Sequence, residues 1–311
     1  MSSITSTPTH TAGSTIIPRS VKPKPPLTTF AIARIIILIV VGLFTLFPVI
    51  WIVSAAFNPV GTMTSQTLIP ANVKSLDDLL VNFNRLFNNP QVPFWRWVLN
   101  SVVIATITTT LTVFISALSA YSFSRFRFRG RRSLLVTILL IQVFPNILAM
   151  VAIYLMLLQI GTYIPFLSLN THGGLILAYL GGAMGVNTWL MKGFFDTVPR
   201  DIDESALVDG ATHWQTFWYL IFPLVRPVLA VVAILAFVGT FNEFILARIV
   251  LTDRQNWTLM VGLFNFVEAE FSNDWGVFAA GSLLAATPVV ILYLALQKYI
   301  VGGLTQGAVK G

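Results

Sequence analysis

Long runs of apolar residues dominate this chain, and short polar segments separate them. The runs cover residues 31–57, 97–123, 133–160, 173–195, 222–250 and 276–301. A helix needs about 20 apolar residues to cross roughly 30 Å of hydrocarbon, and each run reaches that length. The pattern therefore predicts an all-α membrane protein whose residues 30–301 form six transmembrane helices.

The first run decides between a cleaved signal peptide and a retained helix. It is longer than the roughly 7–15 residues of a signal-peptide core, although Ser54-Ala55-Ala56 faintly resembles a cleavage site. We therefore expect a retained helix. The preceding residues 1–29 are rich in Ser, Thr and Pro, which predicts a disordered tail.

Several runs contain residues that bend helices, namely Pro48, Pro145, the pair Gly181-Gly182 and Pro288. Membrane helices tolerate such residues where neighbouring helices satisfy the freed backbone groups. We therefore expect kinked helices that pack together as a bundle.

Composition supports the membrane assignment and narrows the chemistry. Apolar residues make up 56% of the chain and charged residues 10%, whereas soluble domains carry about 25% charged residues. The chain has no cysteine, and His10, His172 and His213 match no metal-binding spacing, so we expect no bound metal. The net charge of +7 comes from basic residues at membrane edges, which argues against a nucleic-acid partner.

The positions of Lys and Arg predict the orientation. Residues 125–132 contain five arginines, and the N-terminal tail adds Arg19, Lys22 and Lys24. Because basic residues gather on the cytoplasmic side, six spans place both termini inside. Residues 58–96, 161–172 and 252–275 then lie on the extracytoplasmic side.

The polar segment between the fourth and fifth runs reads as two short helices around a turn. Asp201 precedes Glu204 by three residues, the spacing of a capping box, so we expect Asp201 to cap the first helix. Gly210 stands where that helix must end, because glycine adopts the required positive φ. Thr212 and Gln215 predict a second capping box.

The same segment resembles the EAA loop of ABC importer permeases, which reads Glu-Ala-Ala, three residues, Gly, nine residues and Ile-x-Leu-Pro. The matching residues are Glu204, Ala206, Gly210 and Pro223, with Ser205, Leu220 and Phe222 as small or apolar replacements. In that family the loop docks on a cytoplasmic ATPase. The resemblance implies an ATPase-coupling loop over about 196–221, followed by a chain break at Pro223, with the residues Asp203, Glu204, Ser205, Ala206, Asp209, Gly210, Leu220 and Pro223.

From about residue 30 onward the chain resembles the smaller permease subunit of bacterial maltose/maltodextrin importers. The likeness rests on Tyr163–Phe166, Leu169–Gly174, Ala178–Gly182 and the terminal Gly302–Gly311. It implies a type I permease in the bacterial inner membrane that carries maltose, maltodextrin or a related oligosaccharide. It also implies a second permease subunit, a cytoplasmic ATPase dimer that binds ATP and Mg, and an extracytoplasmic sugar-binding protein.

The residues agree that this chain performs no chemistry itself. It lacks the Walker A pattern GxxxxGK[ST], so a partner must hydrolyse ATP. Glu204 has no second carboxylate beside it and fits a docking role better than acid–base catalysis. Asn242 and Glu243 lie inside the fifth run, where an ionisable group is costly and often functional, so both a functional and a structural role remain open.

Two further segments gain a function from the resemblance. The outer loop 252–275 is rich in aromatic residues, and we expect Trp257, Phe264, Phe266 and Glu268 to contact the binding protein, although the loop could instead pack on its own subunit. The tail 302–311 contains several glycines, which predict a non-helical end. The resemblance implies that Gln306, Gly307, Ala308 and Val309 reach the interface between the ATPase subunits.

The main alternative is a stand-alone secondary transporter. Such proteins usually contain repeated halves and several intramembrane charges, and this chain has no clear repeat and only Glu243 deep in a run. A membrane enzyme would need a nucleophile–base set or paired carboxylates, which the sequence does not offer.

Overall fold

The computed structural model describes residues 29–60, 62, 66–71, 73–267 and 274–308. The described residues form helices and no strand, which confirms the predicted all-α fold class. The helices are α1 (Thr29–Ala56), α2 (Leu76–Asn88), α3 (Phe94–Arg125), α4 (Arg131–Val143), α5 (Asn146–Gly161), η1 (Pro165–Leu167), α6 (His172–Phe195), α7 (Asp201–Val208), α8 (His213–Gln215), η2 (Thr216–Ile221), α9 (Phe222–Leu224), α10 (Arg226–Asn242), α11 (Ile245–Val250), α12 (Leu259–Phe264) and α13 (Trp275–Ala308).

The chain forms two compact units, Met1–Pro48 and Val49–Gly311, which divide within α1. In the first unit α1 exposes large apolar side chains on all sides, for example Phe30, Ile37 and Phe44. A helix that is apolar all round is typical of a membrane span. The first apolar run is one continuous helix.

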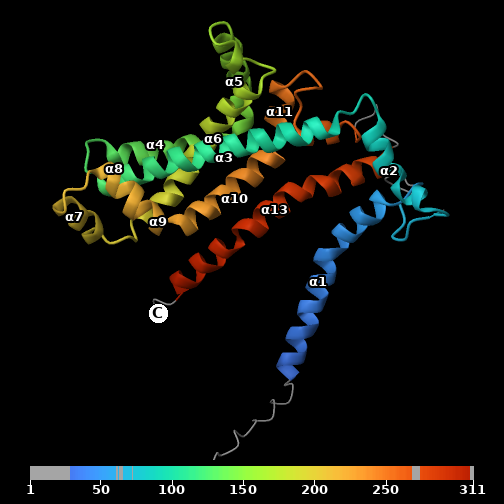
Figure 1. Cartoon of the computed structure of the whole chain (residues 1–311), viewed down its shortest axis with the longest axis horizontal. Helices are drawn as coiled ribbons and strands as arrows, with labels where there is room; N and C mark the ends of the chain where they lie inside the picture. The colour runs from blue at the N-terminus through green and yellow to red at the C-terminus, as the bar shows by residue number, and fades with distance from the viewer. Residues whose placement is uncertain (1–28, 61, 63–65, 72, 268–273, 309–311) are drawn as a thin grey trace, which may run out of the picture. The chain divides into compact units, whose positions relative to one another are not determined.

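The core of the second unit consists of α3, α6 and α10, which lie side by side, with α13 along α10 (Figure 1). Buried apolar side chains form one cluster towards the N-terminal end of α3, which includes Trp97 and Ile104. A second cluster surrounds Tyr121 at the opposite end, where Phe195 and Phe217 pack. These clusters fix both ends of α3 within the second unit.

Among the described residues, three helices are long and apolar enough to cross a membrane alone: α1, α3 and α13. Three bent pairs raise the number to six if each pair crosses once. The pair α4–α5 bends by 102° next to Pro145, α6 bends by 52° just after Gly182, and His213–Leu224 meets α10 at 78°. The first two bends occur at the proline and glycines that predicted kinks.

The fifth predicted run differs from expectation, because it is not one helix. Pro223 lies inside the short helix α9, and the chain breaks at Val225 instead. The cause is Pro227, whose ring in a continuous helix would clash with the carbonyl group of Pro223. The run breaks again after Asn242, where α10 ends before α11.

The C-terminal segment also differs from expectation. We expected the glycines of 302–311 to prevent a helix, but the backbone of α13 stays helical to Ala308. Each glycine costs only about 1 kcal/mol in a helix. Extending an existing helix is easier than starting one, so a long helix can continue through scattered glycines. Residues 309–311, including Val309, lie outside the described residues.

Candidate coupling site

The segment after α6 folds as the predicted pair of short helices. Gly210 has φ +85°, as expected for the residue that ends α7. Its N–H donates to the carbonyl oxygen of Leu207 at 3.1 Å, and Ala211 N–H donates to Ala206 at 2.9 Å. This pair of hydrogen bonds is a Schellman motif, which satisfies the last carbonyl groups of the helix.

The caps confirm one expectation and correct another. Thr212 and Gln215 form the predicted capping box, with Gln215 N–H donating to Thr212 Oγ1 at 3.3 Å and Thr212 N–H donating to Gln215 Oε1 at 2.8 Å. Asp201, by contrast, does not cap α7, because the helix already begins after Arg200, which has helical dihedral angles. Asp201 instead stands in the first turn, where its charge favours the positive helix end.

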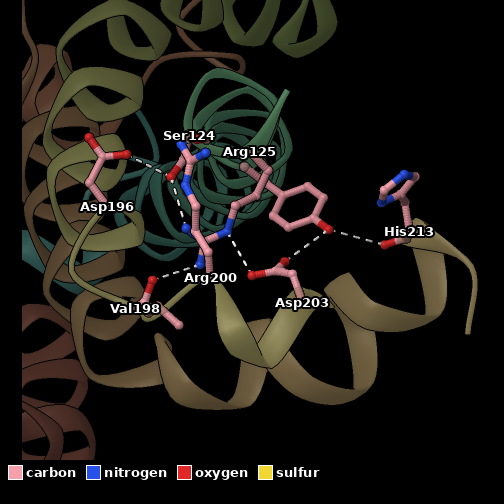
Figure 2. Close-up of polar contacts among 8 residues, drawn as sticks. Ser124, Arg125, Asp196, Val198, Arg200, Asp203 and His213 are labelled. Carbon is pink, nitrogen blue, oxygen red and sulfur yellow. Dashed lines mark hydrogen bonds and ion pairs between the residues drawn. The ribbon is translucent and has the colours of Figure 1, made fainter. Parts of the chain in front are cut away.

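A buried ion pair fastens α7 to the C-terminal end of α3 (Figure 2). Arg125 Nε lies 2.9 Å from Asp203 Oδ2, and the two side chains are only 6% and 11% exposed. Tyr121 Oη lies 3.4 Å from Asp203 Oδ1 and 3.5 Å from the carbonyl oxygen of His213, so its proton can serve either. Tyr121 of α3 thus contacts both short helices, α7 through Asp203 and α8 through His213.

Backbone contacts tighten the same junction (Figure 2). Arg125 Nη2 donates to the carbonyl oxygen of Val198 at 3.0 Å, and Arg200 Nη2 donates to that of Ser124 at 3.1 Å. Asp196 Oδ1 accepts a 2.6 Å hydrogen bond from Ser124 Oγ. The two arginines therefore cross-link the start of the segment to the last turn of α3.

Asp196 stays charged at this junction. Burial alone would raise the pKa of Asp196, but the hydrogen bonds from Lys192 and Ser124 and the charges of Lys192 and Arg131 outweigh burial and hold that pKa below its usual range. The carboxylate can therefore keep accepting hydrogen bonds from α3 and α6 at neutral pH.

The opposite face of α7 is free of these contacts and faces outward. Glu204 and Ser205 are exposed, Leu207 is 40% exposed and Val208 is 88% exposed. Large exposed apolar residues beside charged ones are typical of a docking surface for another protein. We call the exposed residues Glu204, Ser205, Leu207 and Val208 the outer face of α7.

The other expected loop residues divide between these two roles. Ala206 is buried against the junction, whereas Asp209 and Gly210 are exposed beyond the end of α7. Leu220 is exposed in the π-helix η2, and Pro223 is half-buried. Sequence analysis missed the anchoring role of Arg125 and Tyr121, because Arg125 is one of five clustered arginines and nothing local marks it as buried.

Asn242 and Glu243, the polar pair inside the fifth apolar run, lie at the break between α10 and α11. Glu243 Oε1 accepts from Leu246 N–H at 2.8 Å, and Oε2 accepts from Ala247 N–H at 3.0 Å. Tyr179 of α6 donates to Oε2 at 2.7 Å. Glu243 therefore caps α11 and ties it to α6, while the side chain of Asn242 is exposed.

The outer loop is held from within by residues that we expected to be contacts. Trp257 and Phe266 are 6% and 4% exposed and belong to the buried cluster near the N-terminal end of α3. Burial follows from their size, since large aromatic side chains stabilise a core strongly. Phe264, at 38% exposed, is accessible, and Glu268 lies outside the described residues.

Polar contacts connect this loop to α3. Trp97 Nε1 donates to the carbonyl oxygen of Arg254 at 2.8 Å, and Asn100 Nδ2 donates to that of Trp257 at 3.0 Å. The guanidinium group of Arg248 lies over the Trp257 ring, 5.2 Å from its centre. These contacts hold residues 254–257 of the outer loop against α3.

These features define a class: a helical membrane protein with several spans, whose short clamped helix offers an outward face to a partner. Residues 112–306 match the family of binding-protein-dependent transport system inner membrane components. The chain belongs to this family. It is a permease subunit, as the resemblance to ABC importer permeases predicted.

Curated relatives cover most of the chain. The maltose/maltodextrin transport system permease protein MalG of Vibrio vulnificus strain YJ016 is 41% identical over 272 residues, which cover 86% of this chain and 91% of the relative. The protein of the same name from Escherichia coli K12 is 36% identical over 297 residues, which cover 94% and 99%.

Solved structures share the fold. A crystal structure of a bacterial ABC transporter involved in the import of the acidic polysaccharide alginate aligns with a TM-score of 0.71 at 24% identity, covering 87% of this chain and 96% of that one. A structure of a bacterial alginate ABC transporter, in complex with a periplasmic protein bound to an alginate pentasaccharide, aligns with a TM-score of 0.63 at 16% identity and covers 86% and 92%.

Proposed function

We propose that this chain is one of two permease subunits of an ATP-driven importer for maltose, maltodextrin or a related oligosaccharide. Relatives named maltose/maltodextrin transport system permease protein MalG are 36–41% identical over nearly their whole length. The chain forms half of the path for the sugar and is not itself an enzyme. ATP and Mg bind to the ATPase dimer, and an extracytoplasmic binding protein delivers the sugar.

The chain crosses the inner membrane six times with both termini in the cytoplasm. The arginines of 125–132 favour the cytoplasmic side. Arg125 of this group pairs with Asp203 in α7, so the basic segment and the coupling segment lie on the same side. This placement supports the orientation because a coupling segment must face the cytoplasmic ATPase.

The outer face of α7 docks on the ATPase, and the junction at Asp203 passes the movement to α3. The observation that carries this proposal is the division of α7 into two faces. One face is fixed by a buried ion pair, and the other exposes Leu207 and Val208 to a partner. A short helix without the clamp could yield under load, whereas a clamped helix moves together with α3.

The outer loop and the C-terminal helix add two contacts. Phe264, together with Glu268, contacts the binding protein, and Trp257 and Phe266 hold that loop in place from inside. At the other end, α13 continues beyond the apolar span Trp275–Gln297 to Ala308. These last residues extend about 16 Å as helix, enough for Gln306 to reach a docked ATPase dimer.

Native mass spectrometry of the complex, purified through a tag on this chain, tests the assignment. We expect a second, different permease chain and two copies of an ATPase. Sugar uptake into vesicles should require ATP and the binding protein. Uptake by this chain alone, driven by an ion gradient, would contradict the proposal and support a secondary transporter.

Gly210→Val tests the coupling role of the turn. A Cβ at Gly210 would meet no atom within 4 Å, so the substitution acts through the backbone alone. The positive φ costs a branched residue about 1–2 kcal/mol, which should distort the end of α7. We expect a clear loss of sugar-stimulated ATPase activity with normal membrane insertion.

Gly210→Asn is the matched control, because Asn adopts a positive φ more readily and should retain most of the stimulation. Full stimulation in the valine variant would show that the turn plays no part in coupling.

A further inference from the structure

A basic cavity of about 560 Å³ lies where α4 begins and α6 ends. Arg131, Arg132 and Ser133 of α4 and Lys192 of α6 line it, together with the apolar Phe128 and Leu135. We call this cavity the basic pocket. In the proposed topology, α4 and α6 cross the membrane and the basic pocket lies at their cytoplasmic ends. The pocket is therefore at the depth of the lipid headgroups.

The charge of the basic pocket is strongly positive. The sequence from residue 125 to 195 contains no Asp or Glu. Asp196 lies near the pocket, but it is already engaged by Lys192 and Ser124. Within the described part of the chain, Arg131 and Arg132 form no ion pair with an acidic side chain. The guanidinium group of Arg132 is therefore available to an anion, and Arg131 adds its charge although it also acts on Asp196.

The start of α4 adds to this preference. Gly130 precedes the helix with φ +86°, and among the described residues no side chain caps it and no acidic residue stands in its first turn. The partial positive charge of a helix N-terminus attracts anions such as phosphate. The partial positive charge at the start of α4 therefore adds to the positive charges of Arg131 and Arg132.

A largely apolar groove lies farther along the same two helices. This second hollow of about 220 Å³ is lined by Ile115 and Ser119 of α3, by Ile138, Ile141 and Gln142 of α4, and by Gly181, Gly185 and Thr188 of α6. Ile138 lies one turn beyond Leu135, and Thr188 lies one turn before Lys192. The basic pocket and the apolar groove therefore follow each other along the α4–α6 pair.

We propose that this combined site binds an anionic phospholipid of the phosphatidylglycerol type. The headgroup phosphate lies against Arg131 and Arg132, and an acyl chain follows the groove past Ile138 and the open space beside Gly181. A soluble phosphate would use only the basic end. An amphiphile uses both, which is why the observations favour a lipid. In the proposed topology the site opens to the cytoplasmic leaflet, and the inference rests on the proposed function in that respect alone.

Photolabelling of the assembled transporter tests the site directly. The complex is reconstituted in phosphatidylcholine nanodiscs that contain a diazirine-tagged phosphatidylglycerol or, separately, an equally tagged phosphatidylcholine. After illumination, peptides are mapped by mass spectrometry. We expect phosphatidylglycerol adducts on residues 131–142 and 181–192, at several times the level of phosphatidylcholine adducts. An excess of soluble glycerol phosphate should not remove them.

Two charge-matched variants separate a built site from general surface charge. Arg131→Gln with Arg132→Gln should lower phosphatidylglycerol labelling of these peptides about tenfold or more. Arg127→Gln with Arg129→Gln removes the same charge from exposed residues outside the lining and should change labelling less than about twofold. If the first variant fails to assemble, Arg131→Lys with Arg132→Lys keeps the charge and should keep the labelling.

Several results would overturn the proposal. These are equal labelling by the two lipids, an equal decrease in both variants, displacement by glycerol phosphate, or crosslinks from these peptides to the partner permease instead of lipid. None of these readouts requires transport. The experiment can therefore contradict the lipid site without contradicting the transport function, and a failure of the transport proposal would leave the labelling result valid.

Discussion

Arg125 and Asp203 are the residues on which the coupling segment depends most. Their charges are almost fully removed from water, and each is compensated chiefly by the other. Removing one partner of a buried pair leaves an unpaired charge, whereas replacing both with apolar residues removes the problem. The pair can therefore be tested as a unit.

We expect Asp203→Ala to destabilise the transporter by about 3–5 kcal/mol, because Arg125 would stay buried without a counter-charge. Arg125→Met combined with Asp203→Leu should recover most of that loss. The measurement is the unfolding free energy of the purified complex in nanodiscs.

The matched control for this cycle is Asp201→Ala, which removes an exposed acid from the same helix and should cost less than about 1 kcal/mol. A double variant as unstable as the single one would rule out the ion pair as the cause.

At the scale of elements, helix breaks matter as much as helices. The break between α10 and α11 is stabilised by Glu243, whose carboxylate accepts from two backbone N–H groups and from Tyr179. This geometry accounts for an ionisable group within an apolar run as the cap of a broken helix. The structural role of Glu243 is to cap α11 and to link it to α6.

Glu243→Ala should lower stability by about 1–3 kcal/mol, since the N–H groups of Leu246 and Ala247 lose their acceptor. Tyr179→Phe removes only the donor that reaches from α6 and should cost about 0.5–1.5 kcal/mol. Asn242→Ala, next in sequence but exposed, should change stability by less than about 0.5 kcal/mol. Thermal unfolding of the purified transporter ranks the three variants, and a different order would contradict the capping role.

Sequence patterns predicted the elements better than their ends. Each apolar run corresponds to a helix or a bent pair of helices long and apolar enough to cross a membrane, because lipid imposes a length and composition that few other structures share. The turn at Gly210 and the cap at Thr212 were also predictable, since both depend on local backbone geometry. The break at Glu243 and the partner of Asp203 were not, because they depend on which helices meet in three dimensions. The break at Val225 has a local cause, Pro227, which sequence analysis passed over in favour of Pro223.

At the scale of the whole molecule, α13 is longer than a membrane span requires. It contains 34 residues, about 51 Å of helix, while the hydrocarbon layer is roughly 30 Å thick. Deleting Gln306 to Gly311 should therefore lower sugar-stimulated ATPase activity, because the deleted end would no longer reach the ATPase dimer.

Binding of the sugar by the delivery protein should not change on this deletion. Lys310→Ala, which keeps the length, serves as the control for a loss of charge. Normal stimulation after the deletion would show that the end of α13 makes no functional contact.

The stiffness of α3 couples movements at its two ends. Its 32 residues contain neither proline nor glycine, so it is a stiff rod about 48 Å long. One end holds the outer loop through Trp97 and Asn100, and the other holds α7 through Arg125. A rod cannot tilt at one end only. Any swing that the ATPase imposes on α7 must therefore appear at the outer loop at the same moment, in the opposite direction if the pivot lies between them.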